Sequence, residues 1–428
     1  MKKLRQHIAP LLLLSALAML QSACQQDDAP TVGRGFAAST TTLTLDAQVQ
    51  QMLTRAGAEG MMTDKKLTET GFGVFAFGLG DGWSNRKIDY HGTPLTESDL
   101  GDVHLHPEWN YDTGVDWADG QELSFLAYAP YVETGVSGKP GITGITSSSV
   151  DATTIAYQVA KKPSEAVDLL WGVRASTGLP WLSVTGSECG GLVLFTFQHA
   201  LAGLSYRVQA MIDKDNDLSD LTDVSDPNSL LGSEVKVLLK RITLQPATGT
   251  NPGTIYASGA LNLKNSKKDT PYWENDGSTP LSSLTLSDDL DGEIKDDLKS
   301  GSGVLSTPGQ PVIKNDNYFM LIPNTEKKNY QVEVEYDVVV STAGSGSATS
   351  TTTTLSYGGK GANGAAVVTL QNWQFLPGVK YYLNLVIGLK TLTLTVDATD
   401  WAGNTISKEV LTERGTSASS SLARKNRP

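Results

Sequence analysis

The chain has 428 residues, of which 46 are acidic and 34 basic, giving a formal charge of −12. This acidic balance, with no Lys/Arg-rich patch before the C-terminus, disfavours nucleic acid as a partner. Glycine, serine and threonine are abundant and helical periodicity is scarce. Short alternating runs between turn residues therefore predict an all-β protein, long enough for two or three domains.

The first residues have the three-part layout of a secretory signal. The basic residues Lys2, Lys3 and Arg5 precede an apolar run from Ala9 to Leu20, shorter than the roughly 20 apolar residues that a membrane-spanning helix needs. We expect a signal peptide over residues 1–23 and a lipoprotein whose Cys24 thiol carries lipid. Cleavage after Ala23 without lipidation is the simpler alternative. Residues 24–39 are expected to form a polar tether.

A first β domain is expected over residues 40–188. Its first strand is predicted within residues 40–53, where Leu43, Leu45 and Val49 share one face. Other strands are predicted from alternating or apolar runs that end at turn residues: 71–77, 122–130 and 167–173.

A second β domain is expected over residues 189–411, opened by a strand at 192–199. The clearest alternation runs over residues 330–338, whose even positions are apolar, and predicts a strand with one face on a core. Residues 264–299 are predicted to be irregular, and residues 341–354 a flexible hairpin tip. A disordered tail is expected over residues 412–428. Antiparallel strands in two blocks predict two β-sandwich domains in series.

Few residues suggest site chemistry. His104 and His106 fall on one side of a strand, but no third zinc ligand completes them. The acidic run 213–217 lacks the glycine and closing glutamate of a calcium loop, so a solvated loop is favoured and structural calcium stays open. Cys189 has no nearby histidine, which indicates a quiet thiol, and His199 follows an apolar face as a core histidine does. We expect no cofactor, no metal and no enzymatic activity.

Several stretches, taken in order, resemble the fimbrillin-like (Mfa-like) family of type V pilus subunits. They are Leu53–Ala56, Leu123–Pro130, Val167–Leu170, Phe197–Leu201, Phe319–Pro323 and Phe375–Tyr382. The resemblance extends from the leader to Trp401. It implies two transthyretin-like Greek-key sandwiches, export as an outer-membrane lipoprotein and display on the cell surface as a structural pilus subunit that mediates adhesion.

The resemblance also implies a route of assembly. An arginine-specific protease removes the first strand, and a C-terminal strand of another subunit fills the groove by strand addition. The removable segment would be residues 40–55, cut between Arg55 and Ala56, with Arg34 as a rival cleavage site. The donor residues would be Leu392, Leu394 and Val396. The partners implied are further copies of the subunit, the protease, the outer membrane and a host or microbial surface ligand.

Two alternatives stay open. The chain could be a pilus anchor or tip adhesin that does not polymerise, in which case Arg55 would stay uncut. It could instead be a glycan-binding surface lipoprotein that stacks sugar rings on exposed tryptophans. The candidates for that platform are Trp83, Trp109, Trp117 and Trp273.

Overall fold

The computed structural model describes fifteen ranges of the chain, to which every structural statement below refers. They are 40–49, 61–80, 83–92, 109–110, 115–210, 234–274, 280–286, 313–314, 318–324, 326–342, 351–358, 364, 366–387, 391–400 and 405–414. Within them the strands dominate, and the named helical segments are short: α1 (Asp64–Thr70), α2 (Gly186–Cys189) and the 3-10 turn η2 (Pro163–Glu165). The predicted all-β fold class is confirmed.

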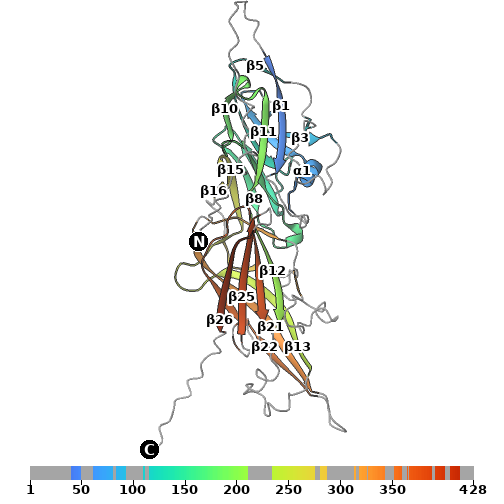
Figure 1. Ribbon diagram of the computed structural model, residues 1–428, viewed down its shortest axis with the longest axis vertical. Helices are drawn as coiled ribbons and strands as arrows, with labels where there is room; N and C mark the ends of the chain where they lie inside the picture. The colour runs from blue at the N-terminus through green and yellow to red at the C-terminus, as the bar shows by residue number, and fades with distance from the viewer. Residues whose placement is uncertain are drawn as a thin grey trace, which may run out of the picture.

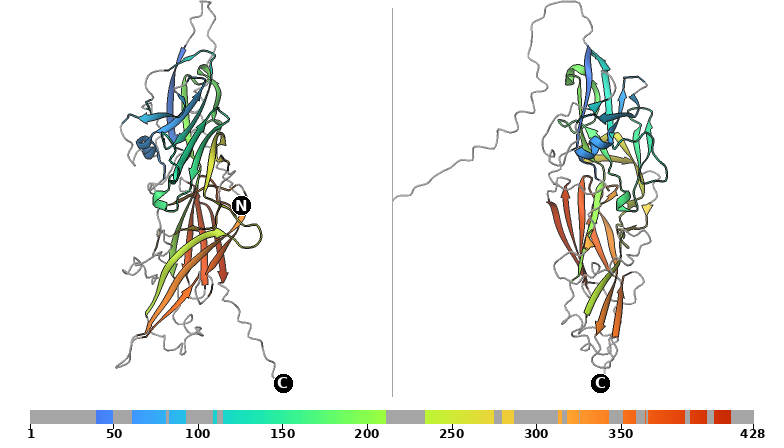
Figure 2. Two further views of the ribbon diagram at one scale, coloured as in Figure 1. Left: turned by 180° about the vertical axis from the view of Figure 1, so that it is seen from behind. Right: turned by 90° about the vertical axis from the view of Figure 1, so that its right-hand side faces the viewer.

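The molecule is elongated, with an upper and a lower half (Figures 1 and 2). The upper half contains a nine-stranded sheet in the order β4-β3-β2-β6-β9-β11-β1-β5, with β10 pairing β6. Its strands are β1 (Thr40–Val49), β2 (Phe72–Phe77), β3 (Arg86–Tyr90), β4 (Trp109–Asn110), β5 (Val115–Ala118), β6 (Glu122–Ala129), β9 (Leu170–Val173), β10 (Trp181–Thr185) and β11 (Leu192–His199).

A four-stranded sheet covers one face of this large sheet, in the order β16-β15-β8-β7. Its strands are β7 (Gly141–Ser147), β8 (Thr153–Gln158), β15 (Ser258–Lys267) and β16 (Thr270–Glu274). The other face is buried because the β1–β5 end of the large sheet curls back over β6. The Trp117 ring of β5 lies edge-on against Phe125 of β6, with centroids 5.6 Å apart.

The lower half is a second sandwich. Its six-stranded sheet has the order β19-β12-β24-β25-β26, with β20 pairing β12, and its five-stranded sheet has the order β18-β13-β21-β22, with β23 pairing β21. The six strands are β12 (Ala202–Ala210), β19 (Ile313–Lys314), β20 (Phe319–Leu321), β24 (Val379–Ile387), β25 (Thr391–Asp400) and β26 (Thr405–Arg414). The five are β13 (Glu234–Pro246), β18 (Leu284–Thr285), β21 (Lys328–Thr342), β22 (Thr351–Tyr357) and β23 (Val367–Trp373), and a separate pair is formed by β14 (Ile255–Tyr256) and β17 (Pro280–Leu281).

Strand β21 shows how well period-two patterning predicts burial here. Its even positions from Tyr330 to Val338 are at most 2% exposed, whereas the odd positions face outward. A strand with one face on a core and one in water requires this alternation. The neighbouring strand β13 pairs with β21 along twelve register positions, so this pair is the longest ladder of the five-stranded sheet.

The structure corrects the predicted domain boundary. Strand β11, expected to open the second domain, pairs in parallel with β1 and antiparallel with β9 in the upper half. The change of half comes at Ala200–Leu201, which are fully buried, so no turn signal marks it. The Gly190–Gly191 pair, which lies next to the predicted boundary, ends α2 in a left-handed conformation.

A second correction concerns residues 264–299, predicted to be irregular. The β15–β16 hairpin occupies residues 258–274 and lies in the upper half, although the strands before and after it lie in the lower half. Strand β15 pairs with β8, about a hundred residues earlier in the sequence. The predicted disordered tail also starts too early, because β26 continues to Arg414.

Candidate functional site

Strand β1 lies inside the upper sheet although it is the first strand that the structure describes. Its first part, Thr40–Leu43, pairs antiparallel with β5, and its second part, Thr44–Val49, pairs in parallel with β11. The backbone N–H of Thr44 donates to the Gly191 carbonyl at 2.8 Å, where the first part gives way to the second. β1 therefore closes the sheet between two neighbours that are distant in sequence.

The inward face of β1 is part of the upper core. Leu43 and Leu45 are 0% exposed and Ala47 and Val49 are 3% exposed, in a cluster that includes one phenylalanine of β2 and both phenylalanines of β11. The face predicted from the sequence is confirmed. Loss of β1 would leave a long apolar groove beside β11.

Beyond Leu43, two backbone N–H groups of β1 donate hydrogen bonds to carboxylates and not to a neighbouring strand. The Ala47 N–H donates to Asp46 Oδ1 at 2.7 Å, and the Val49 N–H donates to Asp64 Oδ1 at 2.6 Å. Asp64 is the first residue of α1, so α1 holds the end of β1. In this part β1 has a strand ladder on one side and hydrogen bonds to side chains on the other. It is therefore held in the sheet less firmly than a strand with a ladder on each side.

The chain is anchored again directly after the segment 50–60. Met61 and Met62 are buried, and the Met62 N–H donates to Asp168 Oδ2 at 3.1 Å. The same carboxylate oxygen lies 2.7 Å from His199 Nδ1, and both side chains are at most 3% exposed. His199 is thus a core histidine, as predicted. Asp168 was missed, because its partners lie far from it in sequence.

Several predicted site residues lie outside the described residues. They are Cys24, Arg34, Arg55, Ala56, His104, His106 and the acidic run 213–217. Cys189 is described: it ends α2, and its Sγ donates to the Thr185 carbonyl at 3.5 Å. Within the described ranges, no three His, Cys, Asp or Glu side chains gather in a metal-binding arrangement, and no helix has the length and apolarity to cross a membrane.

The predicted donor residues lie in an inner strand. Leu392, Leu394 and Val396 belong to β25 and are at most 2% exposed. β25 pairs with β24 over nine register positions on one side and with β26 on the other. In this conformation these side chains fill the core of their own subunit, and β26 is the strand at the edge of the sheet.

Three of the four tryptophans considered for a glycan platform are buried. Trp83, Trp109 and Trp117 are 8%, 4% and 0% exposed and pack in the upper core. A platform built on these three is therefore ruled out. Trp273 of β16 is only partly buried and lines a cleft.

The fold agrees with that of a solved fimbrial protein from Bacteroides vulgatus, which superimposes over 84% of this chain and 99% of its own with a TM-score of 0.52 at 18% identity. The chain has the fold of a bacterial fimbrial protein. The sequence matches no protein-family model and no curated protein.

Two further structures cover similar shares and superimpose less closely. One is described as a cell adhesion protein from Bacteroides uniformis (13% identity, TM-score 0.38, 85% and 99% covered), and one as a fimbrial assembly protein from Parabacteroides distasonis (14%, 0.35, 88% and 99%). The fold assignment therefore rests on the Bacteroides vulgatus structure. It confirms, at the level of the fold, the resemblance to fimbrial proteins that the sequence motifs predict.

Proposed function

We propose that this protein is a structural, non-enzymatic subunit of a cell-surface pilus that mediates adhesion. The subunit polymerises by strand exchange after proteolysis. The observation that carries the proposal is the position of β1. It is a buried, sheet-closing strand at the N-terminal side of Arg55, and beyond Leu43 only one strand ladder holds it. Its removal would open a groove whose backbone and pockets only another strand can satisfy.

The fold favours Arg55 over Arg34 as the processing site. A cut at Arg34 precedes β1 and would leave it attached to the rest of the domain. A cut at Arg55 separates β1 from α1, while Met62, held by Asp168, keeps the new N-terminus in place. Only the second cut can release β1.

The energetics make release conditional on a replacement strand. Burial contributes about 1.5–3 kcal/mol for each large aliphatic side chain, so losing Leu43, Leu45 and Val49 costs on the order of 5 kcal/mol. That is a large share of the stability of an ordinary domain. An empty groove would be short-lived, and a strand from another copy would offset the cost.

The donor strand is drawn from the C-terminal strand pair. β26 leaves most easily, because it is an edge strand paired only with β25, whereas β25 can leave only by breaking its pairing with β24 as well. Leu392, Leu394 and Val396 then act as donors only if β25 and β26 move together. β1 and β26 lie in opposite halves of the molecule (Figure 1), which suits head-to-tail growth.

The leader supplies the location. Lipid on Cys24 would hold the precursor at the outer membrane, and a cut at Arg55 would separate the mature chain from that lipid. An uncut copy would stay tethered, as an anchor subunit requires. Lipid on Cys24 and cleavage at Arg55 together account for both roles. A copy cut at Arg55 would be a shaft subunit, and an uncut copy would be an anchor.

The test is the N-terminus of surface-exposed protein, combined with electrophoresis without heating. Cells expressing the wild-type chain should yield a chain that begins at Ala56 in high-mass, heat-sensitive ladders. Arg55→Ala should keep the precursor N-terminus and form no ladders, because β1 stays in its sheet. Arg34→Ala is the matched control and should assemble as wild type does. Ladders from Arg55→Ala equal to those of wild type would refute processing at this site.

A further inference from the structure

A cleft of about 890 Å³ lies at the junction of the two halves. One wall is the β15–β16 hairpin, which belongs to the four-stranded sheet of the upper half. The opposite wall belongs to the lower half and is formed by Pro323, Asn324, Glu326, Lys328, Gln374, Leu376 and Pro377. Pockets of this volume that combine apolar rings with a few polar groups are the usual form of small-ligand sites.

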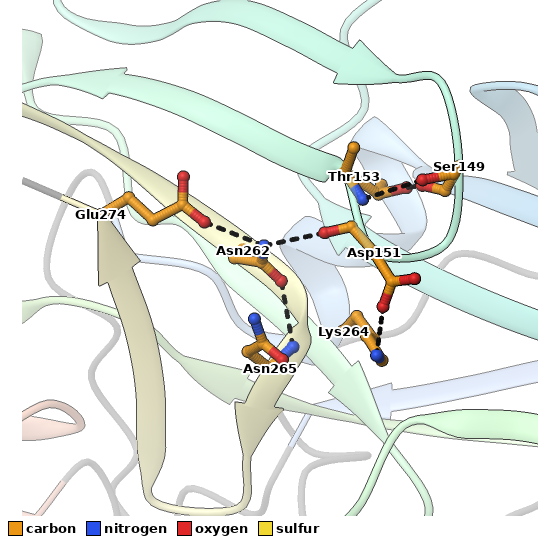
Figure 3. A network of polar contacts seen from close by, with 8 residues as sticks. Ser149, Asp151, Thr153, Asn262, Lys264, Asn265 and Glu274 are labelled. Atoms are coloured by element: carbon orange, nitrogen blue, oxygen red, sulfur yellow. Dashed lines mark hydrogen bonds and ion pairs between the residues drawn. The ribbon is translucent and has the colours of Figure 1, made fainter. Parts of the chain in front are cut away.

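A polar network around the buried Asn262 holds the hairpin wall in place (Figure 3). The Asn262 amide donates to the Asp151 carbonyl at 3.2 Å and to Glu274 Oε1 at 2.9 Å, and its oxygen accepts the Asn265 N–H at 3.0 Å. Lys264 adds an ion pair to Asp151. The hairpin is thereby fixed to the β7–β8 turn from behind, so the wall is preorganised.

Two further contacts set the aromatic side chains of this wall. The Tyr272 N–H donates to the buried Ser266 hydroxyl at 2.9 Å, and the Trp273 indole N–H donates to the Ala200 carbonyl at 3.1 Å. Trp273 thus joins the hairpin to the residues that link the two halves. Tyr272 remains 50% exposed, and Tyr256 also lines the cleft.

The opposite wall is braced by amide groups. The Phe375 N–H donates to Asn324 Oδ1 at 2.9 Å, and the Gln374 amide donates to the Asn324 carbonyl at 2.9 Å. Tyr381 accepts the Leu376 N–H at 2.9 Å and so fixes the turn that carries Leu376 and Pro377. Both walls present aromatic or apolar surface next to amide side chains.

The chemistry of the lining selects one class of ligand. Two lysines (Lys267, Lys328) and two carboxylates (Asp269, Glu326) balance, and Lys328 pairs with Glu326 at 2.7 Å, so the cleft favours neither an anion nor a cation. Pro271 removes one N–H from the edge strand β16, which disfavours the addition of a polypeptide strand. Sugar rings suit what remains, because their C–H faces pack on aromatic rings and their hydroxyls bind amides.

We infer that this junction cleft binds a neutral oligosaccharide, with Tyr272 as its exposed stacking surface and Gln374 as an amide contact from the opposite wall. The cleft lies at the side of the elongated subunit, in neither the β1 groove nor the β25–β26 strand pair. On the proposed function, each subunit of a fibre would therefore present one such site. Repetition along a fibre would raise the avidity for a polymeric glycan without any new contact.

The test uses the uncleaved, monomeric chain, so it does not depend on polymerisation. Native electrophoresis in gels that contain a neutral polysaccharide (galactomannan, xyloglucan or pullulan) should retard the wild-type protein, whereas gels with the acidic polysaccharide alginate should not. Titration with the matching hexasaccharide, followed by tryptophan fluorescence, gives the dissociation constant. Tyr272→Ala should weaken binding about tenfold, as expected for loss of one aromatic contact. Gln374→Ala should weaken it less.

Tyr131→Ala is the matched control, because Tyr131 is a partly exposed tyrosine of the upper half that lies outside the cleft. It should bind as wild type does, and all variants should show thermal midpoints within about 2 °C of wild type if the fold is kept. No retardation in any neutral gel would overturn the inference. Equal binding by Tyr272→Ala and wild type would overturn it as well, as would a preference for alginate. None of these results would affect the test at Arg55.

Discussion

Single residues determine how closely β1 packs against the neighbouring chain, and Gly191 is a clear example. Its φ is +81°, and a Cβ added there would lie 2.4 Å from the Thr42 carbonyl of β1. Neighbouring Gly190 has a similar φ of +61° but open space around the same position. The two glycines share the backbone constraint and differ in contact with β1.

Replacing each glycine with alanine separates the two effects. Gly190→Ala should cost about 1 kcal/mol, since only the left-handed backbone is penalised. Gly191→Ala should cost about 2–4 kcal/mol, because β1 or β11 must also shift. Urea unfolding of the precursor measures both. If the clash with β1 is the cause, the excess cost at Gly191 should vanish in a chain that begins at Ala56. An excess that persists there would show that the clash is with something else.

At the residue scale the sequence predicts apolar burial well and polar burial poorly. Leu43, Leu45 and Val49 could be placed because alternation alone decides which face they occupy. Asp168 and Asn262 could not, because a polar side chain is buried only when partners satisfy it. Those partners, His199 and Glu274, are brought near by the fold and not by the sequence.

At the scale of the element, the proposed function requires that another strand can replace β1. Its second half pairs in parallel with β11 alone, and the pairings of β11 with β9 and of β2 with β6 do not involve it. A chain that begins at Ala56 should therefore fold, and should bind a synthetic peptide of residues 40–50. Strand addition supplies both the ladder and the side chains for the pockets.

The peptide should raise the thermal midpoint of the shortened chain and bind with a dissociation constant in the micromolar range or tighter, measured by calorimetry. A peptide carrying Leu45→Asp is the control, because a carboxylate in a 0% exposed position is costly. It should bind at least a hundredfold more weakly. Equal binding of the two peptides would mean that the groove does not recognise the side chains on the buried face of β1.

The sequence does not predict which strands that are distant along the chain pair with each other. Residues 264–274 look irregular because Lys264, Lys267, Lys268 and Asp269 interrupt the apolar pattern. In the structure these charges lie on an edge hairpin or its turn, where charges and Pro271 protect an open edge. That this hairpin returns to pair with β8 depends on the whole fold. The assignment of β11 to the upper sheet is non-local in the same way.

At the scale of the whole molecule, the two halves share one continuous core. A single cluster of buried residues runs from Tyr128 and Tyr157 in the upper half to Tyr330, Tyr336 and Tyr381 in the lower half. The fold class followed from composition, but this continuity did not, since it depends on buried residues such as Ala200 and Leu201 at the junction. The halves should consequently unfold together.

The five buried tyrosines make that shared core sensitive to alkaline pH. Burial raises the pKa of all five, and brings it to about 12 for Tyr330 and Tyr381. In the unfolded chain a tyrosine ionises near pH 10. Because the folded pKa is the higher one, the folded state binds more protons above pH 10. Its stability is therefore complete below pH 10 and falls as the pH rises toward 12.

Each such tyrosine should lower the free energy of unfolding by about 1.4 kcal/mol per pH unit in this window. Thermal melts should show one midpoint that is constant between pH 7 and 9.5 and falls steeply from pH 10 to 11.5, with absorbance at 295 nm rising in the same transition. Tyr330→Phe should reduce the slope of the unfolding free energy against pH by the contribution of one proton above pH 10. Its thermal midpoint should still be constant between pH 7 and 9.5. Two separate transitions would contradict a core that the two halves share.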